Sequence, residues 1–157
     1  MRRGTRSSFD RIAIIVLGIV TINAKKVVIG TVAYTVGTFT LAVVWHVLLF
    51  DDRYRAFGYI EGEPKFVVGF LTILLQGVIL SILYPMVQIA GAGILRGIKF
   101  SFLVGTFFWT SHVLAFIAKQ PVKNVGLFVT METVYLALQF GLFGILIGLI
   151  YREVHAA

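Results

Sequence analysis

The chain has 157 residues, of which 59% are hydrophobic, and its mean hydropathy is +0.95. This is more apolar material than a soluble domain of this length needs for its core, so the composition indicates a protein embedded in lipid. The lack of cysteine excludes disulfides, thiol chemistry and cysteine metal sites. The net charge of +7 does not indicate nucleic-acid binding, because the basic residues lie at the ends of apolar segments.

Residues 1–26 are predicted to be a basic N-terminal extension. Within it, residues 11–22 are apolar, but as a helix they would reach only about 18 Å, whereas the hydrocarbon core is about 30 Å thick. We expect a short interfacial or half-buried helix there. An uncleaved extension is the alternative, since the small-residue cleavage site of a signal peptide does not follow.

Residues 27–157 are predicted to form a single transmembrane domain. A helix needs about 20 apolar residues to cross a bilayer, and four segments satisfy this: 27–50, 66–90, 99–118 and 125–151. The loops between them are too short to hold a further domain. The predicted fold class is therefore an all-α membrane protein with a four-transmembrane-helix bundle.

The two halves of this domain share a pattern. The first contains GTFTLAVVWHVLLF and the second GTFFWTSHVLAFIA, and an LQ pair lies in the span that follows each run. His46 and His112 are 66 residues apart, and Gln76 and Gln139 are 63 apart. Because each unit contains two spans, both units keep the same orientation. The pattern predicts two parallel helical-hairpin repeats related by an axis along the membrane normal.

The distribution of basic residues predicts the topology. One side of the predicted membrane carries nine of the 14 Lys and Arg residues: Arg2, Arg3, Arg6, Arg11, Lys25, Lys26, Arg96, Lys99 and Arg152. The other side carries five: Arg53, Arg55, Lys65, Lys119 and Lys123. The richer side is expected to be cytoplasmic. We therefore predict a multi-pass protein of the inner (cytoplasmic) membrane with both termini inside the cell.

Each span carries its polar side chains on one face. A hydroxyl residue precedes each histidine by eleven positions, which is three turns along the same face. Unsatisfied polar groups cost several kcal/mol in hydrocarbon, so these faces are expected to point into the bundle. The predicted polar cluster, and candidate ligand-binding site, consists of His46, Gln76, His112, Glu132 and Gln139.

Glu132 is the only acidic residue within a span. A lone carboxylate there is protonated, paired or exposed to water. His46 and His112 lie at a similar depth, so we expect at least one of them next to Glu132. Three interpretations stay open: a structural hydrogen-bonded cluster, a proton-coupled or ligand-binding site, and a metal or haem site.

No cofactor is predicted, and a small redox subunit is kept as the alternative. His46 and His112 could act as two axial haem ligands, or could hold a divalent metal together with Glu132. However, Trp45 and Trp109 leave little space for haem, and a dense metal-binding motif is lacking. A phosphate-binding glycine loop, a nucleophile elbow and a catalytic triad pattern are also lacking, so we predict no catalytic residues and a non-enzymatic role.

The last span also carries a face of small residues: Ala137, Gly141, Gly144 and Gly148. Such faces let helices approach closely. This one lies nearly opposite the polar face of the same helix. We expect it to contact another helix, from a second copy of the chain, or from within the same chain, such as the 12–22 segment.

Four runs carry a resemblance to a known class of proteins: VVWHVLLFDDRYRAFGYI, LLQGVILSILYP, WTSHVLAFIAKQPV and METVYLALQFGLFGILIGLIY. Over residues 27–151 the chain resembles small bacterial four-span membrane proteins of the domain-of-unknown-function kind. The resemblance implies a bacterial inner-membrane protein and no catalytic residue or ligand.

From the residues themselves we predict a polar pocket in the outer leaflet. It would bind or pass a small solute, or the protein would be an accessory subunit of a membrane complex. The expected partners are the lipid bilayer and either a second copy of the chain or a larger membrane complex.

Overall fold

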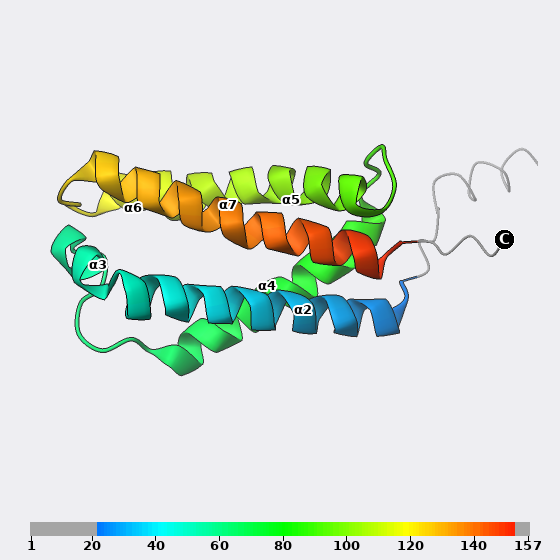
Figure 1. Ribbon diagram of the computed structural model, residues 1–157, viewed down its shortest axis with the longest axis horizontal. Helices are drawn as coiled ribbons and strands as arrows, with labels where there is room; N and C mark the ends of the chain where they lie inside the picture. Colours follow the sequence, from blue (N-terminus) through cyan, green and yellow to red (C-terminus); the bar gives the residue numbers. More distant parts are fainter. Residues whose placement is uncertain (1–21, 153–157) are drawn as a thin grey trace, which may run out of the picture.

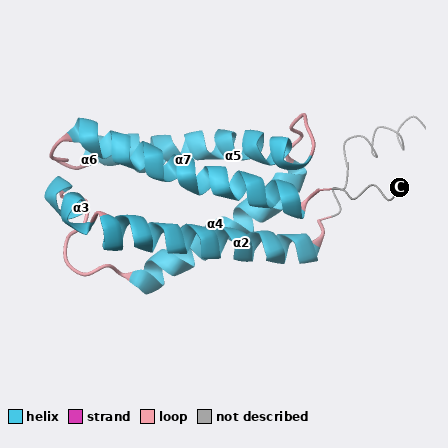
Figure 2. Cartoon of the chain, in the orientation of Figure 1, coloured by secondary structure: helices cyan, strands magenta, loops and turns pink. Residues whose placement is uncertain are grey.

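The computed structural model describes residues 22–152, and this part of the chain contains helices and loops without strands (Figure 2). The elements in chain order are α2 (Ala24–Ala42), η1 (Val43–Leu49), α3 (Asp51–Phe57), α4 (Phe66–Met86), α5 (Gly93–Trp109), η2 (Thr110–Leu114), α6 (Ala115–Lys119) and α7 (Val125–Ile150). Four continuous helical segments are long and apolar enough to cross a membrane: Ala24–Leu49, Phe66–Met86, Gly93–Lys119 and Val125–Ile150. The predicted all-helical class, with four helices long and apolar enough to span a membrane, is confirmed. The helix expected at 11–22 lies outside the described residues, apart from Ile22.

The third span begins at Gly93, six residues before the predicted start at 99. The basic side chains of its first turns reach back to carbonyls of the preceding segment. Arg96 Nη2 donates to the carbonyls of Tyr84 and Val87, at 3.3 and 3.0 Å, and Lys99 Nζ donates to that of Ala90 at 3.0 Å. Long basic side chains can therefore sit at the end of an apolar helix while their charges stay near the boundary.

The spans are arranged in the order α4, α2, α7, α5, since α2 packs on both α4 and α7, and α5 packs on α7 (Figure 1). One end of the bundle, here called the α3 end, holds α3, α6 and the loops beside them. The opposite end, here called the terminal end, holds both ends of the described chain and the 87–92 loop. Figure 1 shows α4 crossing α2 obliquely, whereas α5 runs along α7. The gap between α4 and α5 consequently widens toward the α3 end.

Glycines bring α5 and α7 together at the terminal end. A Cβ added to Gly97 would collide with the backbone of Gly144 and Gly148, and one added to Gly148 would lie 2.7 Å from the carbonyl oxygen of Gly93. The neighbour of Gly144 and Gly148 is thus α5. From the sequence, the expected neighbour is a helix of a second copy or of the same chain, such as the 12–22 segment; α5 belongs to the same chain.

The core lies along α7, which contributes the most buried residues. At the terminal end the ring centroids of Tyr84 and Phe100 are 5.1 Å apart, and those of Tyr34 and Phe143 are 4.9 Å apart. The outward faces are apolar: Phe102, for example, is 76% exposed. A surface of this kind is stable in hydrocarbon, so the arrangement fits an integral membrane protein.

Candidate functional site: a polar cluster and its cavity

The two histidines occupy the same kind of backbone. The first span widens from α-helix into the π-helix η1, which carries His46, and the third span widens into η2, which carries His112. π-Helical turns occur often at functional sites, because the extra residue redirects a side chain. Both turns lie in the half of the bundle nearer the α3 end, where α7 carries Glu132.

The structure brings Glu132 together with both histidines. The Glu132 side chain is fully buried, and its two oxygens are divided between the two imidazoles. Oε1 lies 3.1 Å from His46 Nε2, and Oε2 lies 2.8 Å from His112 Nε2. The other ring nitrogen of His46, Nδ1, lies 3.2 Å from the carbonyl oxygen of Ala42. The hydroxyl of Tyr59 lies 3.2 Å from His112 Nε2.

These contacts constrain the proton that His46 and Glu132 share. A carbonyl oxygen only accepts, so His46 Nδ1 carries a hydrogen and donates to Ala42. A further proton must then lie between His46 Nε2 and Glu132. It makes His46 an imidazolium that donates to a carboxylate, or makes Glu132 an acid that donates to a neutral imidazole. In either state the His46–Glu132 pair carries no net charge, which lowers the cost of burying it in a low-dielectric site.

Aromatic residues enclose the cluster. The ring centroids of Tyr54 and Tyr135 each lie 4.5 Å from that of His46. Trp45 Nε1 donates to the hydroxyl of Tyr54 at 2.7 Å. Burial, and then the negative charge of Glu132, raise the pKa of Tyr54 and of Tyr59 above the ordinary value for tyrosine. Both phenols therefore keep their protons.

The α3 segment positions Tyr59. Gly58 ends α3 with φ of 79°, a left-handed conformation that favours glycine. The Tyr59 backbone N–H then donates to the carbonyl of Tyr54 at 3.0 Å. Arg55 donates from Nε to Asp51 at 2.6 Å and from Nη1 to the carbonyl of Gly62 at 3.0 Å. These bonds fold the loop back so that the ring of Tyr59 reaches the two histidines.

A second hydrogen-bonded chain lies nearer the middle of the bundle. Gln139 Nε2 donates to the hydroxyl of Tyr34 at 2.8 Å, and this hydroxyl donates to Gln76 Oε1 at 3.2 Å. Both predicted glutamines are thus connected through Tyr34, which is not among the predicted residues of the polar cluster. A signal for Tyr34 was available, because it lies one turn before Thr38 and two before Ala42 on the polar face of the first span.

A cavity of about 390 Å³ lies between the histidine cluster and the hydrogen-bonded glutamines. Four of the five predicted residues of the polar cluster line it, and the fifth, Glu132, lies behind the histidines. The lining consists of Thr38, Ala42, His46, Tyr59, Val68, Gly69, Thr72, Ile73, Gln76, Phe108, His112, Tyr135, Leu136 and Gln139. Its volume lies within the range of small-molecule sites, about 300–1,000 Å³.

A separate hollow opens at the α3 end, with a volume of about 450 Å³. Its lining includes Ser111, His112, Lys119 and Gln120. Tyr59 and His112 line both this hollow and the inner cavity, so the two side chains form the wall between them. The His112 side chain is 35% exposed and that of His46 only 13%, which makes His112 the member of the cluster that faces the hollow.

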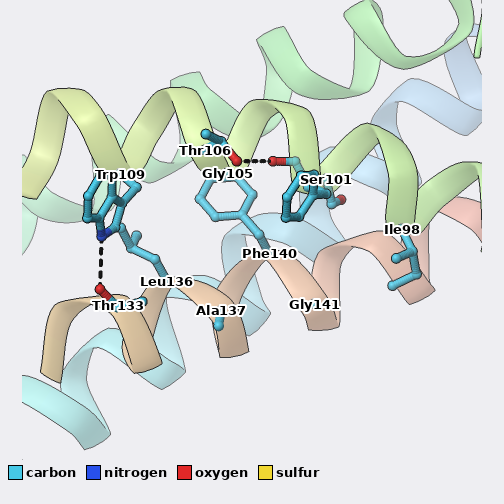
Figure 3. Close-up of a pocket in the computed structure, with 11 residues that line it drawn as sticks. Ile98, Ser101, Gly105, Thr106, Trp109, Thr133, Leu136, Ala137, Phe140 and Gly141 are labelled. Carbon is cyan, nitrogen blue, oxygen red and sulfur yellow. Dashed lines mark hydrogen bonds between the residues drawn. The ribbon is translucent and has the colours of Figure 1, made fainter. Parts of the chain in front are cut away.

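A third hollow is the apolar groove between α5 and α7, shown in Figure 3, with a volume of about 400 Å³. Ala137 and Gly141, two members of the predicted small-residue face, line it, and a Cβ on Gly141 would meet nothing within 4 Å. Trp109 Nε1 donates to Thr133 Oγ1 at 2.9 Å across one end. The small-residue face is therefore divided: its second half packs on α5, and its first half borders this groove.

Four tyrosines complete the site beyond the sequence prediction: Tyr34, Tyr54, Tyr59 and Tyr135. Tyrosine is common at membrane boundaries, so its presence alone did not distinguish a buried role from an interfacial one. Only Tyr135 had a positional signal comparable to that of Tyr34, since it lies three residues after Glu132 and thus on a neighbouring part of the same face.

Within residues 22–152, no group of three or more His, Cys, Asp or Glu side chains is arranged so that it could hold a metal ion. In the cluster itself, the imidazoles approach different oxygens of a single carboxylate. Comparisons of the chain with family models, curated proteins and solved structures find no match.

Proposed function

We propose that the protein is a non-enzymatic membrane protein that binds a small ligand in the cavity beside the His46–Glu132–His112 cluster. The observation that supports this most directly is that the cavity joins residues from all four spans, including both histidines and both glutamines. Polar side chains within a membrane are costly and are often retained for function. Here they surround a space large enough for a ligand.

Binding in this cavity would be linked to the proton between His46 and Glu132. Both ring nitrogens of His46 have partners, so a ligand that bonds to His46 would replace Ala42 or Glu132 and thereby move this proton. The cluster reaches the hollow at the α3 end through His112, where the proton can exchange with water. Replacement of Glu132 by Gln should preserve folding and remove this proton linkage.

This geometry favours ligand binding over the redox alternative. An iron atom coordinated by His46 and His112 would have to displace Glu132 from both Nε2 atoms, leaving a buried carboxylate without partners. The visible absorption spectrum of the purified protein distinguishes the two functions. A Soret band that His46→Ala abolishes would overturn the binding proposal in favour of a haem subunit.

We also propose that the two hairpins are copies of one unit. The support is the pair of π-helical turns, each of which carries a histidine that contacts Glu132. The packing departs from exact two-fold symmetry, since α2 packs closely on α7 whereas the corresponding helices, α5 and α4, diverge.

The proposed location is the inner membrane, with both termini in the cytoplasm. Reporter fusions at Ala157 and at Glu61 test the orientation. We expect a cytoplasmic signal from the first and an extracytoplasmic signal from the second. A cytoplasmic signal from the Glu61 fusion would refute the topology.

Cysteine labelling tests the cavity, and the natural chain provides a background free of cysteine. Gln76→Cys places a thiol in the cavity, and Leu75→Cys places one on the neighbouring residue, which is 61% exposed on the outward face. Maleimide reacts with the thiolate, which forms in a hydrated polar site and not in hydrocarbon. In vesicles we expect membrane-permeant N-ethylmaleimide to label Gln76→Cys at least tenfold faster than Leu75→Cys. Equal rates would show that this cavity is no polar binding site.

A further inference from the structure

The cavity reaches the surface of the bundle between α4 and α5, since exposed residues of α4 line it on one side and Phe108 of α5 lines it on the other. The two helices meet near the terminal end, where Tyr84 contacts Phe100 and Arg96 bonds to the end of α4. They separate toward the α3 end (Figure 1). On the α4 side the opening is bordered by Val68, Gly69 and Thr72, all of them exposed.

The border of this opening presents carbon atoms to the bilayer. Val68 is 59% exposed, and a Cβ on Gly69 would meet nothing within 4 Å. The hydroxyl of Thr72 donates to the Val68 carbonyl at 2.9 Å, so it is satisfied within its own helix. A hydrocarbon chain lying in the opening would therefore not deprive a polar group of its partner.

Together with His112, Tyr59 lies between the cavity and the hollow at the α3 end. Its ring separates the cavity from the hollow at the α3 end and packs against Phe116 and Phe128, with centroid distances of 4.9 and 5.5 Å. Its hydroxyl contacts His112. In this structure a ligand would reach the cavity more directly from the bilayer than from the aqueous side.

The lining determines which head group fits. The deep polar groups are the amides of Gln76 and Gln139, the hydroxyl of Thr38 and the imidazole of His46. Among the described residues that line the cavity there is no lysine or arginine. The carboxylate of Glu132 is already bonded to the two histidines. A phosphate placed here would lose its hydration and would meet no lysine or arginine, while both ring nitrogens of His46 are already bonded. Hydroxyl and carbonyl groups would find both donors and acceptors.

We propose that the cavity receives an uncharged amphiphile, whose head bears hydroxyl and carbonyl groups, from the bilayer through the opening between α4 and α5. This proposal rests on the proposed binding function and specifies its ligand class and entry route. The head occupies the cavity of about 390 Å³, and the chain extends through the opening into lipid.

The binding test uses 1-monooleoylglycerol, titrated into phosphatidylcholine nanodiscs that hold the full chain, with thermal unfolding as the readout. We expect a saturable rise in the unfolding temperature, because a ligand that binds only the folded state stabilises it. Oleoyl lysophosphatidate, which has the same chain and an anionic head, and free glycerol, which has no chain, should give no saturable rise. An equal rise with lysophosphatidate would overturn the proposed head group, and an equal rise with glycerol would overturn entry from lipid.

Two variants test the site of binding. Gly69→Trp fills the opening and Gln76→Leu removes a deep amide, so each should shift the midpoint of saturation at least tenfold toward higher monooleoylglycerol. Val67→Trp is the matched control, because Val67 is 72% exposed and lies outside the lining. It should leave the midpoint unchanged. A midpoint that does not move in Gly69→Trp would show that the lipid binds elsewhere.

The entry route is tested with the Gln76→Cys chain and a charged methanethiosulfonate reagent that does not cross the bilayer. Labelling from the α3 side should be slow in the natural background and at least tenfold faster when Tyr59→Ala is added. Fast labelling without Tyr59→Ala would refute closure of the aqueous route. Labelling of Gln76→Cys by the permeant maleimide is independent of this outcome, so failure of the lipid proposal remains distinguishable from failure of the binding site.

Discussion

The two halves of the bundle are stabilised by different interactions, although both are built for the same surroundings. At the terminal end, Gly97 brings the backbones of α5 and α7 into direct contact, and apolar rings fill the remaining space. At the α3 end, the helices are held by hydrogen bonds around Glu132 and leave a cavity. Lipid is as apolar as leucine, so hydrophobicity alone cannot drive either contact. Close packing stabilises the half near the terminal end, and hydrogen bonds to the shared Glu132 carboxylate stabilise the half near the α3 end.

The largest effect is expected at the glycine contact. Gly97→Val should destabilise the fold by about 4 kcal/mol, above the ~1–3 kcal/mol usual for overpacking, because the atoms it meets belong to the backbone and cannot rotate away. Reversible unfolding in a bilayer, monitored by steric trapping, would measure this change. The fusion reporters should still show normal insertion, which depends on total hydrophobicity.

The matched control for that variant is Gly141→Ala. Its new methyl group has nothing within 4 Å, so the change should be neutral, or stabilising by about 0.5–1 kcal/mol through the higher helix propensity of alanine. Equal losses of stability in Gly97→Val and Gly141→Ala would show that the half nearer the terminal end does not depend on this particular contact.

The second effect concerns the centre of the polar half. Glu132→Leu removes the acceptor that both histidines share, and should cost about 3 kcal/mol, since a hydrogen bond to a charged group contributes about 1.5–3 kcal/mol. Glu132→Gln keeps one acceptor and one donor and should cost about 1 kcal/mol. Thermal unfolding of the three proteins in one detergent gives the comparison. If the Glu132→Leu variant is as stable as the Glu132→Gln variant, hydrogen bonds to Glu132 do not stabilise the half near the α3 end.

Much of this arrangement could be predicted from the sequence. Hydropathy and length predict the four spans, and the depth and spacing of the polar residues predict that His46, His112 and Glu132 lie on inward faces at a similar level. In the structure both histidines contact Glu132. In lipid a charged or amide side chain has few alternatives to the bundle interior, which makes such predictions sharper than in a soluble protein.

Other parts depend on tertiary contacts that leave no periodic pattern. The loop carrying Tyr59 is folded by Gly58, Arg55 and backbone bonds, none of which repeats at helical spacing. The α4–α5 opening comes from the oblique path of α4, which depends on how glycines and large residues interlock along α2. Such crossing geometry follows from the shapes of both partners rather than from the hydropathy of one.

The third effect compares the two histidines. His46→Phe should cost about 2 kcal/mol, because both ring nitrogens have partners and two tyrosine rings pack against the imidazole. His112→Phe should cost about 1 kcal/mol, since this side chain is partly exposed and has only Nε2 engaged. Unfolding measurements on the two variants and the natural chain provide the test. A reversed order would mean that the partly exposed His112 contributes more to the stability of the cluster than the more buried His46.

The smallest effect is expected for Tyr59→Phe, and it separates the two ways in which Tyr59 could close the cavity. The change removes one hydroxyl and its contact with His112, so it should cost about 0.5–1 kcal/mol of stability. The phenyl ring keeps its contacts with Phe116 and Phe128, and the Nε2 atom of His112 keeps Glu132 as its partner. The charged methanethiosulfonate should therefore still label Gln76→Cys slowly in this background, in contrast to Tyr59→Ala. Labelling as fast as in Tyr59→Ala would show that the hydroxyl holds the ring in place, and that the cavity opens whenever the bond to His112 breaks.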